Sequence, residues 1–216
     1  MQSPATGAAL SPGLSLDRAS AGRMTVVSDR LNWRVSAIIR RSSSPRASST
    51  THSGLPPNAD GVRWFAREVW PLVVERIPEA VLTLIGKDPP ADLRDGANLP
   101  GRTDITGYVA DPTLYLKETA VFIVPLRAGG GMRVKILDAW RWGLPVCSTA
   151  MCAEGIYYND GEDLIIADDA AEFAAAVARV WSDPALARQL AAGGRATISR
   201  AYDWRSVYRQ WDGIYS

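Results

Sequence analysis

The sequence predicts an α/β fold in which a parallel β-sheet carries helices on both faces. Two observations lead to this prediction. Short apolar runs that match buried strands alternate with longer segments whose apolar residues recur at helical spacing. The most apolar of these runs passes through a glycine-rich stretch directly into a helical pattern. Because neighbouring parallel strands need a crossover connection, usually a helix, this alternation favours a parallel sheet over residues 55–216.

The first helix is expected from Ala59 to Ile77, where aromatic and aliphatic side chains recur at helical spacing. Asn58 suits the N-cap, and Pro71 should break or kink the helix because proline has no N–H. A buried strand that ends in glycine, a short second strand and a short helix are expected next, over residues 81–86, 104–106 and 112–118.

The second group of elements begins with the strongest buried strand, residues 121–124. A helix and two strands are expected next, over residues 131–142, 145–148 and 163–166. Asp168 and Asp169 fit an N-cap and a first-turn acid better than a metal pair. Two helices then run toward the C-terminus, and Asp183 with Pro184 starts the second. The first has an apolar stripe made of Phe173, Val177, Val180 and Trp181.

Residues 1–54 differ in character from the rest of the chain. They hold seven arginines and two aspartates, a balance of +5, whereas residues 55–216 hold 17 basic and 21 acidic residues, a balance of −4. Serine and threonine supply 16 of these 54 residues, and the one apolar stretch, residues 35–39, matches a lone strand with no partner nearby. We expect a solvated, disordered tail outside the fold. A transit peptide and a basic nucleic-acid-binding arm share this composition.

Composition also excludes several classes of protein. No apolar run approaches the roughly 18 residues of a membrane span, and the first 25 residues lack the apolar core of a secretory signal. Two cysteines, Cys147 and Cys152, make neither a disulfide framework nor a closed zinc site. We therefore expect a cytoplasmic protein with reduced thiols, no cofactor, no bound metal and no nucleic-acid partner.

The segment that follows the strongest strand is the candidate binding site, because ligands of α/β sheets sit at the carboxyl ends of the strands. There the chain reads strand, glycine-rich loop, helix, with Gly129, Gly130 and Gly131 in succession. Glycines let the main chain approach a ligand, and a helix start offers free N–H groups to a phosphate. Arg127, Arg133 and Lys135 add positive charge. Neither a Walker A loop nor a GxGxxG motif is present.

Lys135 and Asp138 are three residues apart and so share one face of this helix. Asp138 would lie ~10 Å along the axis from the helix start, at 1.5 Å per residue. That separation suits a carboxylate that binds a ribose diol while the loop binds a diphosphate. A surface ion pair and a merely flexible triple-glycine turn explain the same spacing, and spacing alone does not separate these interpretations.

A series of short segments occurs in a consistent order and spacing over about three quarters of the chain. They are Pro57–Asp60, Trp64–Phe65, Leu84–Lys87, Thr106–Val109, Val124–Arg127, the glycine loop, Lys135–Ala139, Trp142–Val146, Ala153–Ile156, Gly161, Asp163–Asp169 and Tyr202–Trp204. Through these segments, residues 55–216 specifically resemble the carboxy-terminal, Rossmann-like half of a GT-B glycosyltransferase, in the large retaining family known as group 1 or family 4.

The resemblance implies a nucleotide-sugar donor site. The main chain around Gly129, Gly130, Gly131, Met132 and Arg133 would bind the diphosphate. Asp138, at the second acidic position of the family's Glu-x7-Glu motif, would bind the ribose, and the main chain at Tyr108 and Val109 would contact the base. Glu154 would lie in a loop that closes over the donor. Arg127 and Lys135 would neutralise the diphosphate leaving group.

The chain departs from the family pattern in three places. The first acid of the motif is replaced by Gly130, and Asp138 is one methylene shorter than glutamate. Nothing before Leu55 resembles the acceptor-binding half, and the first strand of the donor-binding half is not recognisable. His52, in a polar segment, is a solvated side chain rather than a catalytic histidine. A truncated or frame-shifted chain would show such a change of character, and the sequence leaves this question open. A separately encoded amino-terminal half and self-association are the partners that the resemblance leaves open.

The leading hypothesis is a retaining glycosyltransferase that moves a sugar from a nucleotide-diphosphate sugar to an unknown acceptor. The chain would supply the donor-binding half, and its activity alone is an open question. The alternative is a non-catalytic nucleotide-binding remnant or a partner-dependent interaction module. A related GT-B epimerase is a third interpretation.

Of the eight tryptophans, Trp64, Trp70, Trp140 and Trp181 fit apolar helix stripes and are expected in the core.

Overall fold

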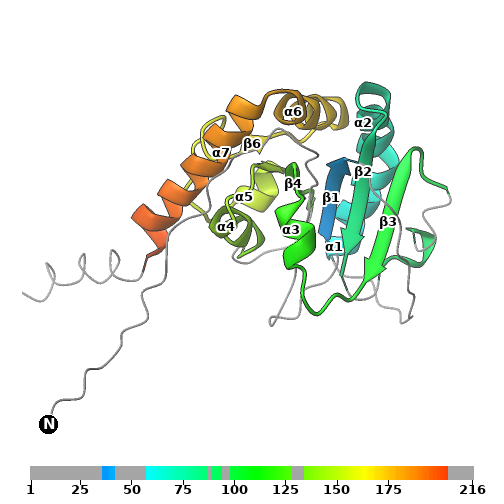
Figure 1. Cartoon of the computed structure of the whole chain (residues 1–216), viewed down its shortest axis with the longest axis horizontal. Coiled ribbons are helices and arrows are strands. Elements are labelled where there is room, and N and C mark those ends of the chain that lie inside the picture. Colours follow the sequence, from blue (N-terminus) through cyan, green and yellow to red (C-terminus); the bar gives the residue numbers. More distant parts are fainter. Residues whose placement is uncertain (1–35, 42–56, 87–88, 94–97, 128–133, 204–216) are drawn as a thin grey trace, which may run out of the picture.

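A six-stranded sheet forms the centre of the protein, in the strand order β3-β2-β1-β4-β5-β6 (Figure 1). The computed structural model describes residues 36–41, 57–86, 89–93, 98–127 and 134–203. This is the order of a doubly wound sheet, in which the first strand lies at the centre. The strands are β1 Ser36–Arg41, β2 Ala80–Ile85, β3 Arg102–Gly107, β4 Val121–Val124, β5 Val146–Ser148 and β6 Ile165–Ile166.

Strand β1 corrects two expectations from the sequence. It pairs with β2 on one side and β4 on the other, so residues 36–41 belong to the sheet and not to a tail outside the fold. Its partners lie about 40 and 80 residues further along the chain, too far for a local sequence pattern to reveal them. It occupies the central position of the missing first strand and buries Ile39 completely.

The sheet is also not wholly parallel. The pairs β2–β3, β4–β5 and β5–β6 are parallel, as expected, whereas β1 is antiparallel to both of its neighbours. Figure 1 shows β1 pointing against β2 and β3. The remaining five strands run in one direction, so their carboxyl ends still share one edge, where ligands of such sheets bind.

Helices cover both faces of the sheet, which confirms the predicted fold class. Contacts place α1, α2 and α6 in one layer, and α3 and α4 lie on the opposite face (Figure 1). Helix α7 packs against α4 and α6. The main α-helices are α1 Pro57–Trp64, α2 Trp70–Arg76, α3 Thr113–Lys117, α4 Val134–Arg141, α6 Ala170–Ser182 and α7 Pro184–Thr197. Shorter turns are η1 Phe65–Val69, η2 Ala91–Leu93, α5 Ala150–Ala153 and η3 Ile198–Tyr202.

Pro71 widens the first helix instead of ending it. The turn η1 between α1 and α2 is a π-helix, in which the Trp70 N–H bonds to the Phe65 carbonyl, five residues back. Since Pro71 has no N–H, it cannot continue the α-helical ladder, and one wider turn absorbs the mismatch. Helix α1 begins at Pro57, so Asn58 lies in the first turn and not at the expected N-cap.

The C-terminal helices start where the sequence predicts. The Asp169 carboxylate accepts the N–H groups of Ala171 and Glu172, and Asp183 does the same for Ala185 and Leu186. Asp168 has a different role, since it accepts the Ala150 N–H at the start of α5. It therefore links the segment after β6 to the segment after β5.

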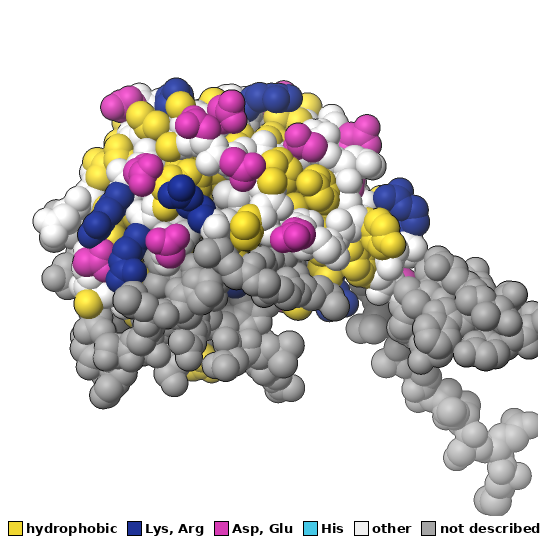
Figure 2. Space-filling view, turned by 180° about the vertical axis from the view of Figure 1, so that it is seen from behind, with side chains coloured by type: hydrophobic (Ala, Val, Ile, Leu, Met, Phe, Trp, Pro, Cys, Tyr) yellow, Lys and Arg dark blue, Asp and Glu magenta, His cyan; other side chains and the backbone are white. Residues whose placement is uncertain are grey.

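The surface seen from behind carries basic and acidic side chains intermixed over α1, α2 and α6 (Figure 2). Within the described residues, no helix is long and apolar enough to cross a membrane. The same part of the chain contains no group of three His, Cys, Asp or Glu side chains that could bind a metal ion.

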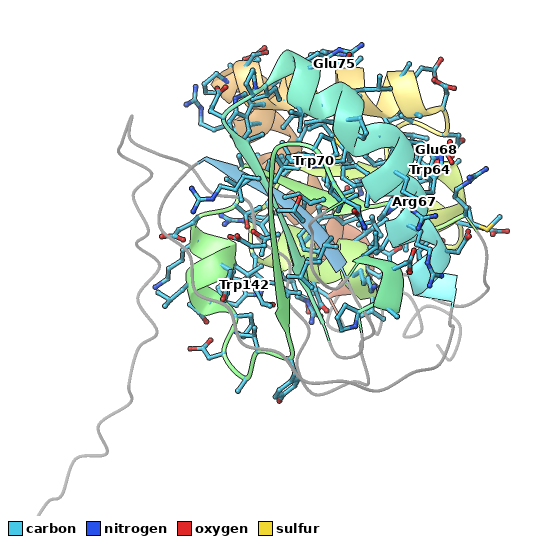
Figure 3. The ribbon with its side chains drawn as sticks, turned by 90° about the vertical axis from the view of Figure 1, so that its right-hand side faces the viewer. Trp64, Arg67, Glu68, Trp70, Glu75 and Trp142 are labelled. Atoms are coloured by element: carbon cyan, nitrogen blue, oxygen red, sulfur yellow. The ribbon has the colours of Figure 1, made fainter. Side chains whose placement is uncertain are left out.

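The core confirms the expected tryptophans. Trp70 and Trp140 are fully buried, and Trp64 and Trp181 are nearly so. Trp142 is different: it lies on the α3 side of the sheet, opposite to Trp64, and 48% of its surface is exposed (Figure 3). Trp204 and Trp211 lie outside the described residues.

Candidate functional site

The chain leaves β4 at the carboxyl edge of the sheet through Pro125, Leu126 and Arg127, and this segment is firmly held. The Val124 carbonyl accepts the Thr149 N–H at 3.2 Å and the Ser148 hydroxyl at 3.3 Å. The Leu126 carbonyl accepts the buried Thr149 hydroxyl. The end of β5 therefore fixes the main chain that leads into the glycine-rich segment.

Helix α1 fixes the same segment from the other side. A Cβ atom on Gly61 would lie 2.3 Å from the Pro125 carbonyl oxygen and 2.9 Å from the Leu126 Cα. Real Cβ contacts do not come below 3.0 Å, so only glycine allows this approach. Gly61 therefore lets α1 lie directly against the chain after β4.

Arg127 projects toward α1. Its guanidinium carbon lies 5.1 Å from the centre of the Trp64 ring, within the range of a cation–π contact. The Arg127 side chain is exposed, whereas Trp64 is only 6% exposed. A buried ring thus supports a cation at the carboxyl edge of the sheet.

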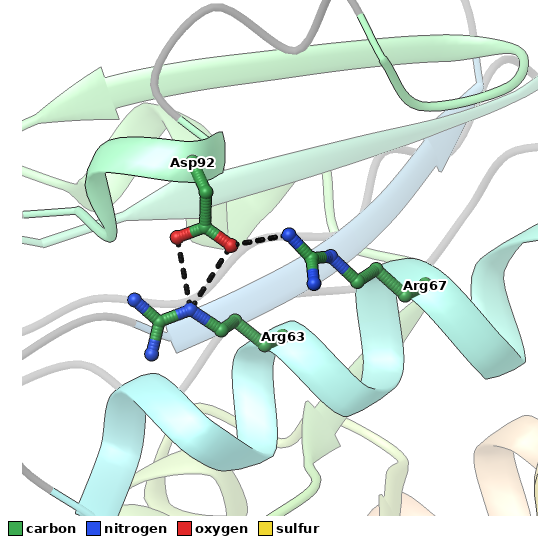
Figure 4. A network of polar contacts seen from close by, with 3 residues as sticks. All are labelled: Arg63, Arg67 and Asp92. Carbon is green, nitrogen blue, oxygen red and sulfur yellow. Dashed lines mark hydrogen bonds and ion pairs between the residues drawn. The ribbon is translucent and has the colours of Figure 1, made fainter.

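Two other arginines of this layer are bound to one carboxylate (Figure 4). Arg63 and Arg67 approach Asp92 at 2.9 and 2.6 Å. Burial alone would raise the pKa of Asp92, but the Arg63 hydrogen bond and both guanidinium charges outweigh it and hold that pKa below its usual value. Asp92 thereby links α1 and η1 to the turn after β2.

Helix α4 carries the predicted Lys135 and Asp138, both partly buried. Burial raises the pKa of Asp138, and the Arg141 guanidinium, 4.0 Å away, opposes that rise. A carboxylate with a raised pKa is one that has lost water and still lacks full compensation by charge. It is suited to accept hydrogen bonds from a ligand.

Asp138 lies at a hollow of about 460 Å³ between α4 and the start of α3. One wall is the segment after β3, from Ala110 to Thr113, and Phe122 of β4 is another part of the lining. The exposed indole of Trp142 also borders it. Asp111 is held in place here because its carboxylate accepts the Thr113 N–H at 3.0 Å. Segments about 25 residues apart thus meet around a half-buried acid.

The structure brings some of the predicted site residues together and leaves others apart. Tyr108, which is exposed, and Val109 lead directly into the wall of the hollow at Ala110. Arg127 contacts the α1 layer, and Glu154 is exposed at the end of α5. Gly129, Gly130, Gly131, Met132 and Arg133 lie outside the described residues.

Sequence reasoning missed four residues that shape this region: Gly61, Asp111, Thr149 and, at the hollow, Trp142. Asp111 alone had a readable signal, because Asp-Pro before a short helix is a common helix start. Trp142 is four residues from Asp138 and so shares its helix face, but the opposite wall of the hollow comes from α3. Gly61 and Thr149 act through neighbours from distant parts of the chain, which no local pattern indicates.

Comparison with known proteins identifies the family. The family model described as "Glycosyl transferases group 1" matches residues 49–183. The chain belongs to this family of glycosyltransferases. The matched range runs from α1 to α6 and includes strands β2 to β6 and the hollow at Asp138, whereas β1 precedes it.

Two curated proteins are similar to parts of this group 1 glycosyltransferase chain. A Klebsiella pneumoniae protein described as "Uncharacterized 44.6 kDa protein in cps region" is 27% identical over 166 residues, 71% of this chain and 42% of its own length. The Rhizobium meliloti lipopolysaccharide core biosynthesis glycosyltransferase LpsE is 29% identical over 131 residues, 58% of this chain and 38% of its own. The chain thus spans about four tenths of the length of these relatives.

Solved structures show the same fold. The C-terminal domain of the group 1 protein LpcC from Francisella tularensis has a TM-score of 0.56 at 19% identity, with 68% of this chain and 81% of that one covered. TarM of S. aureus, solved with UDP, has a TM-score of 0.58 at 18% identity, with 75% of this chain and 34% of TarM covered. Anabaena HepE, solved with UDP and glucose, has a TM-score of 0.55 at 17% identity, with 71% of this chain and 45% of HepE covered. The predicted Rossmann-like α/β class is thereby confirmed.

Proposed function

We propose that this chain is the donor-binding half of a retaining glycosyltransferase that transfers a sugar from a nucleotide-diphosphate sugar to an acceptor. The observation that carries the proposal is the half-buried Asp138 at a hollow bounded by the segment after β3. Asp138 lies on α4, and in the sequence the glycine-rich segment comes between β4 and this helix. An acid at a hollow, preceded in the chain by glycines of the kind that let main-chain N–H groups approach a phosphate, suits a nucleoside diphosphate.

Each part of the nucleotide has a partner in this proposal. Asp138 accepts hydrogen bonds from the ribose hydroxyls, which replace the water that burial has removed from it. The base lies against the main chain at Tyr108 and Val109, next to the wall of the hollow. The N–H groups of Gly129–Arg133 bind the diphosphate, and Glu154 contributes to a loop that covers the donor.

Arg127 and Lys135 supply positive charge for the transfer step. When the bond between the sugar and the diphosphate breaks, negative charge develops on the leaving phosphate oxygens. Cations that are already in place stabilise the transition state, in which this charge develops, more than they stabilise the ground state, and so they lower the barrier to transfer. Transfer also needs an acceptor-binding half, and we propose that a separate chain or chain segment provides it in a cytoplasmic enzyme.

The names of similar proteins guide the choice of donor. TarM and HepE were solved with UDP, and LpsE is named as a glycosyltransferase of lipopolysaccharide core biosynthesis. UDP is therefore the first ligand to test, with GDP and ADP beside it.

Calorimetric titration of the full chain with UDP, GDP and ADP tests the proposal. We expect saturable binding of one of them, and absence of binding to all three in a folded sample contradicts it. Lys135→Ala should weaken the diphosphate but not the corresponding nucleoside, because the lysine charge acts on phosphate.

A matched control for this variant is Lys117→Ala. Lys117 is exposed in the last turn of α3, so its replacement removes the same charge from a different place. Equal weakening of nucleotide and nucleoside by Lys135→Ala, or equal effects of the two lysine variants, contradicts the phosphate role of Lys135.

A further inference from the structure

The main chain between β4 and Arg127 is fixed at three successive carbonyl groups. The Val124 and Leu126 carbonyls accept hydrogen bonds from Ser148 and Thr149, and Gly61 of α1 lies against the Pro125 carbonyl. A side chain that leaves from the next residue therefore starts from a rigid point. The direction of the Arg127 side chain then depends on what its own atoms contact.

That contact is the ring of Trp64. The Arg127 guanidinium carbon lies 5.1 Å from the ring centre, and the tryptophan is only 6% exposed. The Trp64 ring is fixed in turn by Phe173 of α6, whose ring meets it edge to face at 5.9 Å. Phe65 meets the same Phe173 ring at 5.6 Å. The guanidinium thus lies over the Trp64 ring, which Phe173 of α6 contacts in turn.

A free arginine side chain samples many rotamers, and ordering it opposes binding. A cation–π contact selects the rotamers in which the guanidinium lies over the ring, at the carboxyl edge of the sheet. The arginine then needs less reordering when an anion arrives.

We propose that Trp64 is a positioning residue that holds the Arg127 guanidinium ready for the donor diphosphate. The inference rests on the proposed function, because it assumes that a diphosphate binds at this edge. It assigns to a buried core tryptophan a second role, which its burial alone does not require. Trp64 acts through Arg127 and does not itself contact the donor.

The test measures binding of UDP and of uridine to the full chain by calorimetry. An exposed cation–π contact corresponds to roughly a two- to fivefold change in affinity. Trp64→Leu should therefore weaken UDP about two- to fivefold and leave uridine unchanged. Trp64→Phe keeps an aromatic face under the guanidinium and should restore most of the loss. In the Arg127→Gln background, Trp64→Leu should have no further effect on UDP, since the group that it positions is gone.

The matched control is Phe65→Leu. Phe65 is fully buried, comes from the next position in the chain and contacts the same Phe173 ring, but the arginine rests on Trp64. It should lower thermal stability to a similar extent and leave UDP affinity unchanged. If Trp64→Leu does not fold, Trp64→Phe takes its place. Its effect on UDP affinity is then compared between proteins that carry Arg127 and proteins that carry Arg127→Gln, with a smaller expected difference.

Three outcomes overturn the inference. Trp64→Leu weakens UDP and uridine binding equally, or it weakens UDP binding as much in the Arg127→Gln background as in the wild type, or Phe65→Leu weakens UDP binding as much as Trp64→Leu does. In each of these cases the tryptophan acts only through the general stability of the fold, and nucleotide binding by the wild type still supports the proposed function. Failure of the folded wild type to bind UDP, GDP and ADP refutes the proposed function and this inference together.

Discussion

Replacing Gly61 by alanine would put a methyl group where the chain after β4 now lies. The new Cβ would be 2.3 Å from the Pro125 carbonyl oxygen, and contacts of real Cβ atoms start at 3.0 Å, so the two segments must separate by at least 0.7 Å. The obstacle is main chain held by Ser148 and Thr149, which cannot rotate away as a side chain would. Overpacking of this kind costs about 1–3 kcal/mol. Alanine regains about 1 kcal/mol through its higher helix propensity.

We therefore expect Gly61→Ala to lower the free energy of unfolding by about 1 kcal/mol, which lowers Tm by roughly 2–4 °C in a domain of this size. Urea unfolding followed by circular dichroism measures the change. Ala175→Gly, at an exposed position of α6, calibrates the propensity term in the same protein. A Gly61→Ala protein more stable than wild type would refute the close approach of α1 to Pro125. Because the shifted segment leads to Arg127, UDP binding should weaken as well.

Two acids, Asp138 and Asp163, lead to the remaining predictions. Burial raises the pKa of Asp138 above the 3.8 of a free aspartate, so the folded state binds this proton more tightly than the unfolded state does. The contribution of Asp138 to the free energy of unfolding is therefore fully present below pH 3.8 and is lost as the pH rises through the raised pKa of the folded state. If Asp138 binds the ribose as proposed, its carboxylate is protonated on acidification already at a pH above 3.8, so UDP affinity should fall there. Asp138→Asn should remove this step from the pH profile of UDP affinity measured by calorimetry. Asp163, 3% exposed, accepts the Asn159 N–H at 3.0 Å and the Thr197 hydroxyl at 2.9 Å. Asp163→Ala should reduce stability by about 3 kcal/mol and Thr197→Val by about 1 kcal/mol, and similar midpoints in urea for wild type and Asp163→Ala would contradict this.

The sequence predicted the elements of the fold from residue 57 onward with small shifts in their ends. Strand 81–86 and strand 121–124 are visible as apolar runs because a strand buried on both faces needs no polar residues. Asp183 and the pair Asp168–Asp169 were predicted at helix starts because a cap acts within three residues along the chain, and within the pair Asp169 is the cap. These features are local, and local features can be found in a single sequence.

The prediction of the site was less complete. Asp138 was found from its spacing and the family resemblance, and the structure adds the hollow beside it. No sequence pattern indicated that Trp142 borders this hollow or that Trp64 supports Arg127. Trp64 and Arg127 lie far apart in the chain, so their contact depends on how the layers pack. Asp138 and Trp142 are four residues apart at the end of α4, and what the layers decide there is that the segment from Ala110 to Thr113 faces them across the hollow.

The near-zero net charge and the 216-residue length say little by themselves, but the order of apolar runs and the glycine-rich stretch after the strongest strand determine the α/β class and the edge where a ligand would bind. Only the tertiary structure decided that residues 36–41 fill the centre of the sheet, antiparallel to both neighbours. A strand's partners are chosen by hydrogen bonds and packing with segments far away in the chain, and a basic, serine-rich surrounding sequence does not reveal them. The same physical reason explains why the sequence indicated Arg127 and Asp138 as candidates, whereas only packing placed the Trp64 ring beside Arg127 and the segment after β3 opposite Asp138.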